Sequence, residues 1–233
     1  HLVVGPMYHT GPLSGMRTLA AGTPVVVLGK FDAERVLQAI DTYRIESSVM
    51  VPTHFKRLLE LPDEVKARYD VSSMKSVSHT GAACPADVKR QMIEWFGPVL
   101  SDAYGATEVG TICNISSEEW LAHPGSVGRV IPPFTRAVVV DDGGNEVPAG
   151  VEGRLYFEDG SGRGVVYPND PEKTAATFIE VDGQYISRWA SYVVSSNRSI
   201  PISFATIRAT AGYSASLISL ESGMTIRMRG FSG

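Results

Sequence analysis

This sequence of 233 residues has few cysteines, a small net charge and only short apolar runs. Lysine and arginine number 21 against 25 aspartates and glutamates, a net charge of −4, which offers no general electrostatic footprint for nucleic acid or anionic lipid. The two cysteines, Cys84 and Cys113, exclude a disulfide scaffold, and we expect them to be reduced in a cytoplasmic protein. Apolar runs such as residues 25–28 are far shorter than the roughly 18–20 residues of a membrane span, so we expect a soluble protein.

What the sequence does contain is alternation between helical and strand patterns. Apolar residues recur at steps of three and four after Asp32, a suitable N-cap, which predicts an amphipathic helix over residues 32–44. Further helices are predicted to begin near Pro52 and Pro85. A short apolar segment precedes each helix, at residues 24–28, 49–51 and 74–77. This alternation predicts an α/β fold, with a mostly parallel sheet flanked by helices.

The pattern changes after about residue 127. Residues 137–140 and 154–157 are predicted strands, separated by the Gly-rich turn 141–145, which is typical of antiparallel β structure. We therefore predict an α/β subdomain over residues 1–128 and a smaller β-rich subdomain over residues 129–186.

Both ends of the sequence differ from what a complete domain would show. His1 leads at once into residues 2–6, which resemble the end of a buried strand and its turn, so we expect further sequence upstream. Residues 187–233 are rich in serine, contain neither lysine nor aspartate, and show no helical or alternating periodicity. We interpret residues 187–233 as a tail unmatched to the rest, frameshifted or disordered.

The segment Asp102-Ala103-Tyr104-Gly105-Ala106-Thr107-Glu108 follows an apolar stretch, so we expect its polar groups to project from the carboxyl end of a strand, where open α/β sheets bind ligands. Tyr104 offers an aromatic face for a purine, and Gly105 permits a close backbone approach. Thr107 can donate to a phosphate oxygen, and Glu108 is a hard carboxylate for Mg²⁺. Asp102 could accept a hydrogen bond from an adenine 6-amino group. These are the parts of a nucleotide site, although a plain glycine turn would explain the segment equally well if it stood alone.

Tyr104-Gly105-Ala106-Thr107-Glu108 resembles the Y-G-x-T-E signature of the adenylate-forming superfamily, which includes acyl-CoA synthetases, peptide-synthetase adenylation domains and luciferases. Other stretches resemble further motifs of this superfamily in the same order: Gly5-Pro6-Met7-Tyr8-His9-Thr10-Gly11, Val51-Pro52-Thr53, Thr80-Gly81-Ala82-Ala83-Cys84-Pro85, Pro124-Gly125-Ser126-Val127-Gly128-Arg129, residues 143–153 and residues 167–174. The resemblance covers residues 1 to about 186 and favours acyl-CoA synthetases. It implies a piece of the large N-terminal domain of such an enzyme.

The resemblance implies a two-step reaction with three small-molecule partners. A carboxylic (fatty) acid attacks the α-phosphorus of ATP to give an acyl-adenylate and pyrophosphate, and coenzyme A then displaces AMP to form a thioester. Within this scheme, Gly81, Ala82 and Ala83 lie against the adenine ring, and Tyr104 covers its other face. The segment from Asp102 through Thr107, with Ala103 and Ala106, contacts the nucleotide, and Glu108 holds Mg²⁺.

His9 has two interpretations: a side chain at the mouth of the acyl pocket that binds the substrate carboxylate or controls access, or a turn histidine satisfied by backbone. His54 and His79 have no partner at metal-ligand spacing, and we expect them to be structural. We expect Cys84 to be an inert thiol and Lys173 a solvated surface lysine.

Some expected parts of the family's site are missing. Nothing before His1 supplies the phosphate loop, and residues 186–190 lack the acidic residue that would grip the ribose. The tail contains no lysine that could assist adenylation. We therefore expect this chain to be inactive alone, although it derives from an ATP-dependent ligase. The alternative is a non-catalytic nucleotide-binding or interaction module. A different Mg²⁺-dependent phosphotransferase would need a Gly-rich, lysine-containing phosphate loop, which the sequence does not show.

Overall fold

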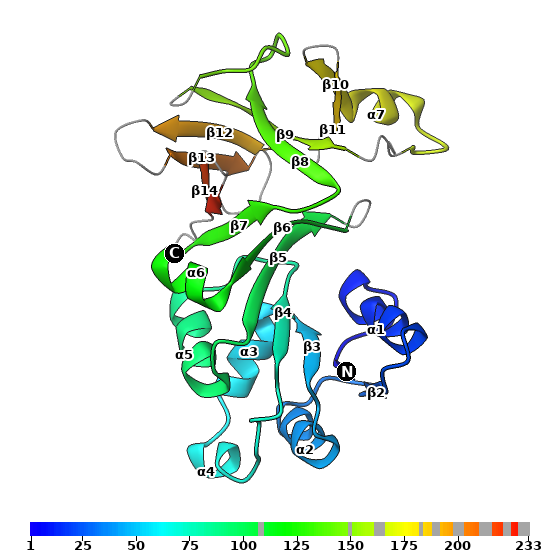
Figure 1. The fold of residues 1–233 in the computed structure, drawn as a ribbon, viewed down its shortest axis with the longest axis vertical. Coiled ribbons are helices and arrows are strands. Elements are labelled where there is room, and N and C mark those ends of the chain that lie inside the picture. The colour runs from blue at the N-terminus through cyan, green and yellow to red at the C-terminus, as the bar shows by residue number, and fades with distance from the viewer. Residues whose placement is uncertain are drawn as a thin grey trace. The chain divides into compact units, whose positions relative to one another are not determined.

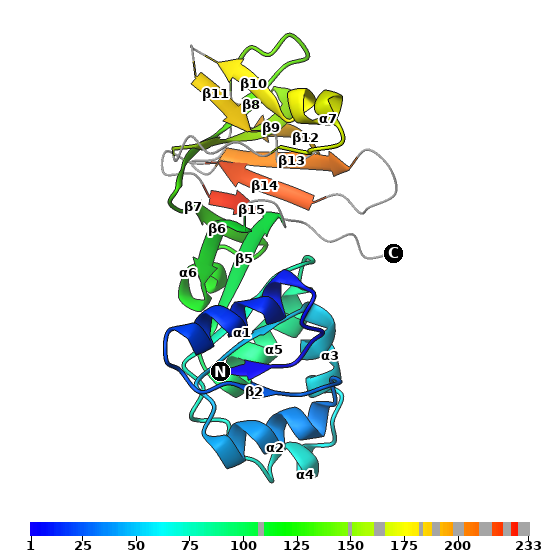
Figure 2. The same ribbon diagram turned by 90° about the vertical axis from the view of Figure 1, so that its right-hand side faces the viewer.

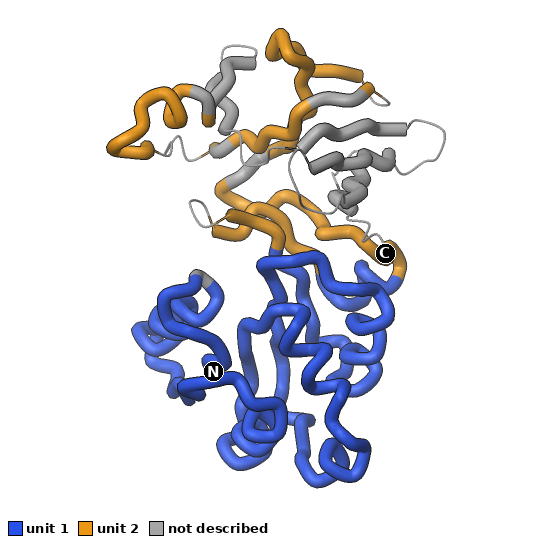
Figure 3. The backbone as a smooth tube through the Cα atoms, turned by 180° about the vertical axis from the view of Figure 1, so that it is seen from behind, with its two compact units in different colours: residues 1–103, 116–121 blue, residues 104–115, 122–233 orange. Residues whose placement is uncertain are grey.

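The computed structural model describes residues 1–106, 110–148, 151–160, 166–181, 184–187, 192–197, 203–209, 216–220 and 225–227. The chain divides into two compact units, shown in different colours in Figure 3. Unit 1 consists of His1–Ala103 and Ser116–Leu121, and unit 2 of Tyr104–Ile115 and Ala122–Gly233.

Unit 1 is built on a parallel sheet. Its strands lie in the order β5-β4-β3-β1-β2, and each neighbouring pair is parallel. The strands are β1 (Leu2–Val3), β2 (Val26–Val27), β3 (Ser47–Met50), β4 (Ser76–His79) and β5 (Leu100–Ala106), the last of which continues into unit 2 at Tyr104. Buried side chains such as Leu2, Met50 and Val77 form the core of this sheet.

Helices cover both faces of the parallel strands. They are α1 (Thr10–Ala20), α2 (Ala33–Tyr43), α3 (Pro52–Leu59), α4 (Asp63–Lys66), α5 (Ala86–Phe96) and α6 (Ser117–Ala122). Helices α3 and α5 lie side by side, and α1 lies on the opposite side of the strands (Figures 1 and 2). This arrangement confirms the predicted α/β fold class with a mostly parallel sheet flanked by helices.

Helix α2 shows how local sequence sets these elements. The Asp32 side chain accepts a hydrogen bond from the backbone N–H of Arg35 at 2.9 Å and so caps the helix. The predicted apolar stripe packs inward, with Val36, Leu37 and Ile40 buried. The helix ends at Arg44, whose positive φ of 49° closes the last turn.

Unit 2 consists mainly of antiparallel strands. Strand β6 (Gly110–Ser116) pairs with β7 (Ser126–Val130), and β7 pairs with β15 (Thr225–Arg227). A second sheet has the order β10-β11-β9-β12-β13-β14, with β8 also paired to β9. Its elements are β8 (Phe134–Val140), β9 (Glu152–Asp159), β10 (Phe178–Val181), β11 (Gln184–Ser187), β12 (Tyr192–Asn197), β13 (Ser203–Ala209) and β14 (Ser216–Leu220), with helix α7 (Pro171–Ala176) before β10.

The predicted hairpin around the Gly-rich turn is confirmed. Strands β8 and β9 pair antiparallel, and the Asp141 carboxylate accepts a hydrogen bond from the backbone N–H of Asn145 within the connection. Val138, Val140 and Tyr156 form a buried cluster on this pair of strands. Four strands, β12 to β15, come from the segment after residue 187, where the sequence showed no periodicity.

Strand β5 continues through Asp102 to Ala106, so the first residues of the nucleotide motif are part of the strand itself. A Cβ on Gly105 would overlap the carbonyl oxygen of Gly110, so two glycines allow the chain to fold back closely on itself. Helix α1 and strand β6 were not predicted. Within the described part of the chain, no helix has both the length and the apolar character needed to cross a membrane.

Candidate functional site

Four of the motif segments emerge at the same edge of the parallel sheet of unit 1. The segment containing His9 follows β1, Val51-Pro52-Thr53 follows β3, residues 80–85 follow β4, and Asp102 lies in β5. The strands are in register, because Met50 pairs with His79 and His79 pairs with Asp102. The carboxyl ends of parallel strands are where α/β sheets bind ligands. The fold therefore gathers segments that are far apart in the sequence into one candidate site.

Residues 81–83 form an exposed loop of small side chains directly after β4. Gly81 has a φ of +86°, which side chains rarely adopt, so a glycine is required at this position. The nearest atom to a Cβ built there is Cγ1 of Val51, at 3.7 Å. Ala82 and Ala83 are exposed. A flat aromatic ring can approach the backbone of such a loop closely, which fits an adenine.

Asp102 is buried at the end of this edge, with 9% of the residue exposed. Its Oδ2 accepts a hydrogen bond from Nζ of Lys89 at 3.4 Å and lies 3.5 Å from Nε2 of His79. Burial raises the pKa of Asp102 to about 6, and the charge of Lys89 partly offsets this. Ala103, the next residue in β5, is half-buried.

The remaining residues of the nucleotide motif fall in unit 2 or beyond the described chain. Tyr104 is half-buried, and its ring centroid lies 6.1 Å from that of Phe157. Gly105 is exposed and Ala106 half-buried at the end of β5. Thr107 and Glu108 lie outside the described residues, and their predicted roles stay predictions.

Magnesium was assigned to Glu108 alone. Within the described ranges, no three His, Cys, Asp or Glu side chains gather closely enough to form a metal site. A protein needs only one or two carboxylates to bind Mg²⁺ when nucleotide phosphates supply the other ligands. Binding of Mg²⁺ by Glu108 together with a nucleotide would therefore need no such cluster.

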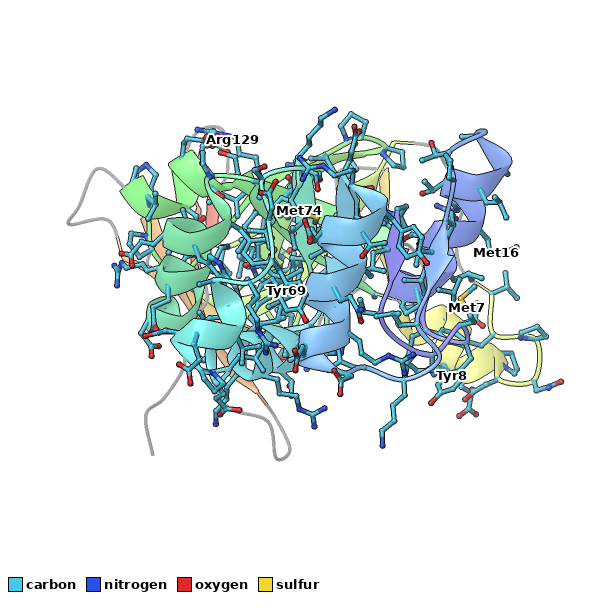
Figure 4. All side chains as sticks on the ribbon, turned by 90° about the horizontal axis from the view of Figure 1, so that it is seen from below. Met7, Tyr8, Met16, Tyr69, Met74 and Arg129 are labelled. Atoms are coloured by element: carbon cyan, nitrogen blue, oxygen red, sulfur yellow. The ribbon has the colours of Figure 1, made fainter. Side chains whose placement is uncertain are left out.

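His9 is exposed at the N-terminus of α1, where it occupies the N-cap position without a capping hydrogen bond from its side chain. Its ring stacks obliquely on Tyr8, with centroids 4.6 Å apart. Met7, Tyr8 and Met16, all exposed, lie on the same side of the molecule (Figure 4). An accessible imidazole beside apolar surface is compatible with either interpretation of His9.

His54, His79 and Cys84 have packed environments. The His54 ring stacks on Phe31 with centroids 4.2 Å apart, and burial lowers the pKa of His54 to about 4. His79 is fully buried and packs edge-on against Phe55. Burial likewise raises the pKa of Cys84 to about 12, so its reactive thiolate is scarce at neutral pH.

Lys89 is the residue at this site that the sequence analysis missed. It is fully buried, and its Nζ lies 4.6 Å from the centroid of the Trp120 ring. A lysine on an amphipathic helix is normally assigned to the surface. The signal lies in its spacing, because Lys89 shares a helix face with Met92, Ile93 and Phe96, all buried.

Comparisons with known proteins agree with the motifs. The family profile described as AMP-binding enzyme matches residues 1–164. The chain is 31% identical over 194 residues to the acetyl-coenzyme A synthetase of Bacillus subtilis, and this match covers 81% of this chain and 33% of that protein. It is 30% identical over 188 residues to the luciferin 4-monooxygenase of Photinus pyralis, and this match covers 78% of this chain and 32% of that protein. The chain thus spans about a third of the length of the curated relatives it matches.

Solved structures show the same fold. The amide bond synthetase McbA from Marinactinospora thermotolerans superposes with a TM-score of 0.72 at 24% identity, over 97% of this chain and 40% of that one. An O-succinylbenzoate coenzyme A synthetase from Bacillus subtilis, in complex with ATP and magnesium ion, superposes with a TM-score of 0.72 at 17% identity. The match covers 97% of this chain and 40% of that one. The resemblance inferred from the motifs is confirmed: this chain belongs to the AMP-binding enzyme family of adenylate-forming enzymes.

Proposed function

We propose that this chain provides the adenylate-binding part of an acid–thiol ligase, which activates a carboxylic acid, such as a fatty acid, with ATP and transfers the acyl group to coenzyme A. The observation that carries the proposal is the shared sheet edge, where the parallel register gathers the His9 segment, residues 81–83 and Asp102. Similarity to an indoleacetate–CoA ligase and a benzoate–CoA ligase, at 30% and 29% identity, supports the acid–thiol chemistry.

In this proposal the adenine ring lies against the backbone of Gly81, Ala82 and Ala83, and Tyr104 stacks on it. The carboxylate of Asp102 accepts a hydrogen bond from the 6-amino group, because an ionised carboxylate is an acceptor and that amino group is a donor. The open surface of the loop and the positive φ of Gly81 support the placement of the ring.

The phosphate chemistry rests on the residues after Ala106. We assign to Thr107 a hydrogen bond to the α-phosphate and to Glu108 the binding of Mg²⁺. When bound, Mg²⁺ neutralises charge as pyrophosphate leaves. Displacement at phosphorus depends on positioning and charge stabilisation more than on covalent help from the protein. We assign to Gly105 and Ala106 the place beside the acyl carboxylate: Ala106 has a small side chain that leaves room, whereas the Cβ position of Gly105 is taken up by the carbonyl oxygen of Gly110.

His9 is proposed to lie at the mouth of the acyl pocket, where it binds the substrate carboxylate or controls access. Its exposure at the start of α1, next to the exposed apolar side chains of Met7 and Tyr8, supports this role. A long apolar acyl chain would find favourable contacts on such a surface.

Nucleotide binding tests the proposal directly. We expect the purified chain to bind AMP in titration calorimetry, and the variant Ala82→Trp to bind it at least about tenfold more weakly because an indole would occupy the place of the adenine. Ala67→Trp, at an exposed alanine at the end of α4, is the matched control and should bind AMP like the unchanged chain. Absence of AMP binding at millimolar concentration, or equal weakening in both variants, would refute the placement.

Turnover is a separate measurement. We expect little pyrophosphate release from this chain with medium-chain fatty acids, ATP and Mg²⁺, because residues 186–190 lack the acidic residue expected to hold the ribose. Loss of one contact that stabilises the transition state typically lowers the rate by about 10²–10³. A rate close to that of an intact synthetase would contradict this expectation while supporting the ligase assignment.

A further inference from the structure

Lys89 places a positive charge in the interior of unit 1. The residue is 0% exposed, although its helix α5 has an open outer face. A buried ammonium is strongly destabilising unless it is paired and hydrogen-bonded. Two neighbours compensate it: Oδ2 of Asp102, at 3.4 Å from Nζ, and the face of the Trp120 ring, at 4.6 Å. Lys89 thereby links α5 to both β5 and α6, which lie close to it in Figure 1.

The Asp102 carboxylate is held through one of its oxygens. Oδ2 contacts Lys89 on α5 and His79 on β4, both of which are fully buried. The Asp102 side chain itself is 12% exposed. The carboxylate is thus anchored from the interior of unit 1 and reaches the surface at the edge of the sheet.

Of the described groups that face Asp102, Lys89 is the cation: burial lowers the pKa of Lys89, and the Asp102 carboxylate opposes this shift. His79 has no hydrogen-bond partner for either ring nitrogen among the described residues, and burial lowers the pKa of His79 to about 3, so the ring is neutral. Cys84, on the loop before α5, interacts weakly with the pair and stays a thiol. Arg90 lies over the Trp120 ring at 5.8 Å.

We propose that Lys89 is a positioning residue that holds Oδ2 of Asp102 and keeps the carboxylate ionised, so that the site selects a 6-aminopurine over a 6-oxopurine nucleotide. The inference rests on the proposed function, since it concerns the nucleotide of that reaction. A 6-amino group donates to the carboxylate, whereas a 6-oxo group presents a second acceptor and is repelled. Protonated Asp102 would lose this discrimination because its O–H could donate to a 6-oxo group.

Removal of the ammonium should therefore change selectivity and not only affinity. We expect the unchanged chain to bind AMP at least about tenfold more tightly than IMP in calorimetry at pH 7.5, within the range of one good base contact. In Lys89→Met, which keeps the length of the side chain but not the charge, the ratio should fall to about threefold or less. Arg90→Met is the matched control, because it removes the neighbouring cation from the same Trp120 ring, and its ratio should equal that of the unchanged chain.

The pH dependence separates positioning from simple structural support. In the unchanged chain the ratio of AMP to IMP affinity should decline as the pH falls from 7.5 to 5, because Asp102, with its pKa of about 6, becomes protonated. In Lys89→Met the same decline should begin at higher pH, because the cation that lowers the pKa of Asp102 is gone. A ratio that is independent of pH in the unchanged chain would overturn the inference without any variant.

Circular dichroism shows whether each variant is folded. If Lys89→Met does not fold, the double variant Lys89→Met with Asp102→Asn contains no unpaired buried charge and should fold, with a ratio near one at every pH. A folded Lys89→Met with unchanged selectivity, when the chain binds AMP, would overturn the inference and leave the proposed function intact. Failure of the unchanged chain to bind either nucleotide would overturn the proposed function and this inference together.

Discussion

The hydroxyl of Ser117 hydrogen-bonds twice to one residue: it donates to the carbonyl oxygen of Leu100 at 2.7 Å and accepts from the backbone N–H of Leu100 at 3.0 Å. Ser117 is the first residue of α6 and is fully buried, while Leu100 begins β5. One side chain thus bonds to both backbone groups of a strand residue, and it fastens the helix to the start of the strand that carries Asp102.

Replacement of this hydroxyl should destabilise unit 1. Ser117→Ala would remove both of these buried hydrogen bonds, and we expect it to lower the free energy of unfolding by about 2–3 kcal/mol in urea titrations followed by circular dichroism. Ser101→Ala is a suitable control, because Ser101 is half-buried on β5 and its hydroxyl has no hydrogen bond among the described residues. Equal effects of the two substitutions would contradict the role assigned to Ser117.

Gly105 should tolerate no side chain. In Gly105→Ala the new Cβ would overlap the carbonyl oxygen of Gly110 and approach Cα of Thr111, which are backbone atoms that cannot rotate away. We expect a loss of at least about 2 kcal/mol in the free energy of unfolding, as is usual for steric conflict with fixed atoms. Gly29→Ala provides the comparison, since a Cβ at Gly29 meets nothing within 4 Å and should change stability by less than about 0.5 kcal/mol.

His79 should make the folded state sensitive to acid. Its pKa is about 3 in the folded protein and about 6.5 in an unfolded chain, so the unfolded state binds a proton first as the pH falls. The contribution of His79 to stability is complete above pH 6.5 and is lost progressively toward pH 3. Asp102 acts in the opposite direction: its raised pKa, about 6, makes its ionisation unfavourable as the pH rises from about 4 to 6.

The variant His79→Leu separates the two groups. Relative to the unchanged chain, it should gain about 3 kcal/mol in the free energy of unfolding between pH 7.5 and pH 4, measured by urea titration at each pH. A constant difference between His79→Leu and the unchanged chain at all pH values would show that folding does not lower the pKa of His79.

Cys84 should react slowly despite its place beside the candidate adenine loop. Burial raises the pKa of Cys84 to about 12, so only a minute fraction is thiolate at pH 8. Alkylation by iodoacetamide in Cys113→Ser, where Cys84 is the remaining thiol, should be at least about a hundred times slower than that of glutathione. Rapid labelling of folded protein would mean that Cys84 is more exposed than the structure has it.

Elements with a clear periodic pattern could be predicted from the sequence. The stripe of Val36, Leu37 and Ile40 behind the Asp32 cap locates α2 almost to the residue, and the alternation of such helices with short apolar segments indicates the parallel sheet. Strand β6 was not predicted because its extended structure depends on the close approach of Gly105 to Gly110, a contact that local sequence does not reveal.

The residues of the candidate site could be proposed from the sequence, but the buried ion pair beneath them could not. The motif positions 81–83 and 102 could be found from their resemblance to a known family, and the register of β4 and β5 brings the two strand ends to one edge. The ion pair below them could not be found, because the pairing of Lys89 with Asp102 depends on how α5 packs on β5. The sequence does contain one indication of this pairing: a charged residue at a position of the apolar stripe of a helix.

The common edge of β1, β3, β4 and β5 has a consequence for how proteins with this architecture diverge. Each segment is held at one end by its own strand, and the strands are fixed to one another by backbone hydrogen bonds that do not depend on side-chain identity. Mutations can therefore accumulate in the segment around His9 without displacing the loop after β4. A lineage with this architecture can change one segment of the edge while it inherits the others unaltered.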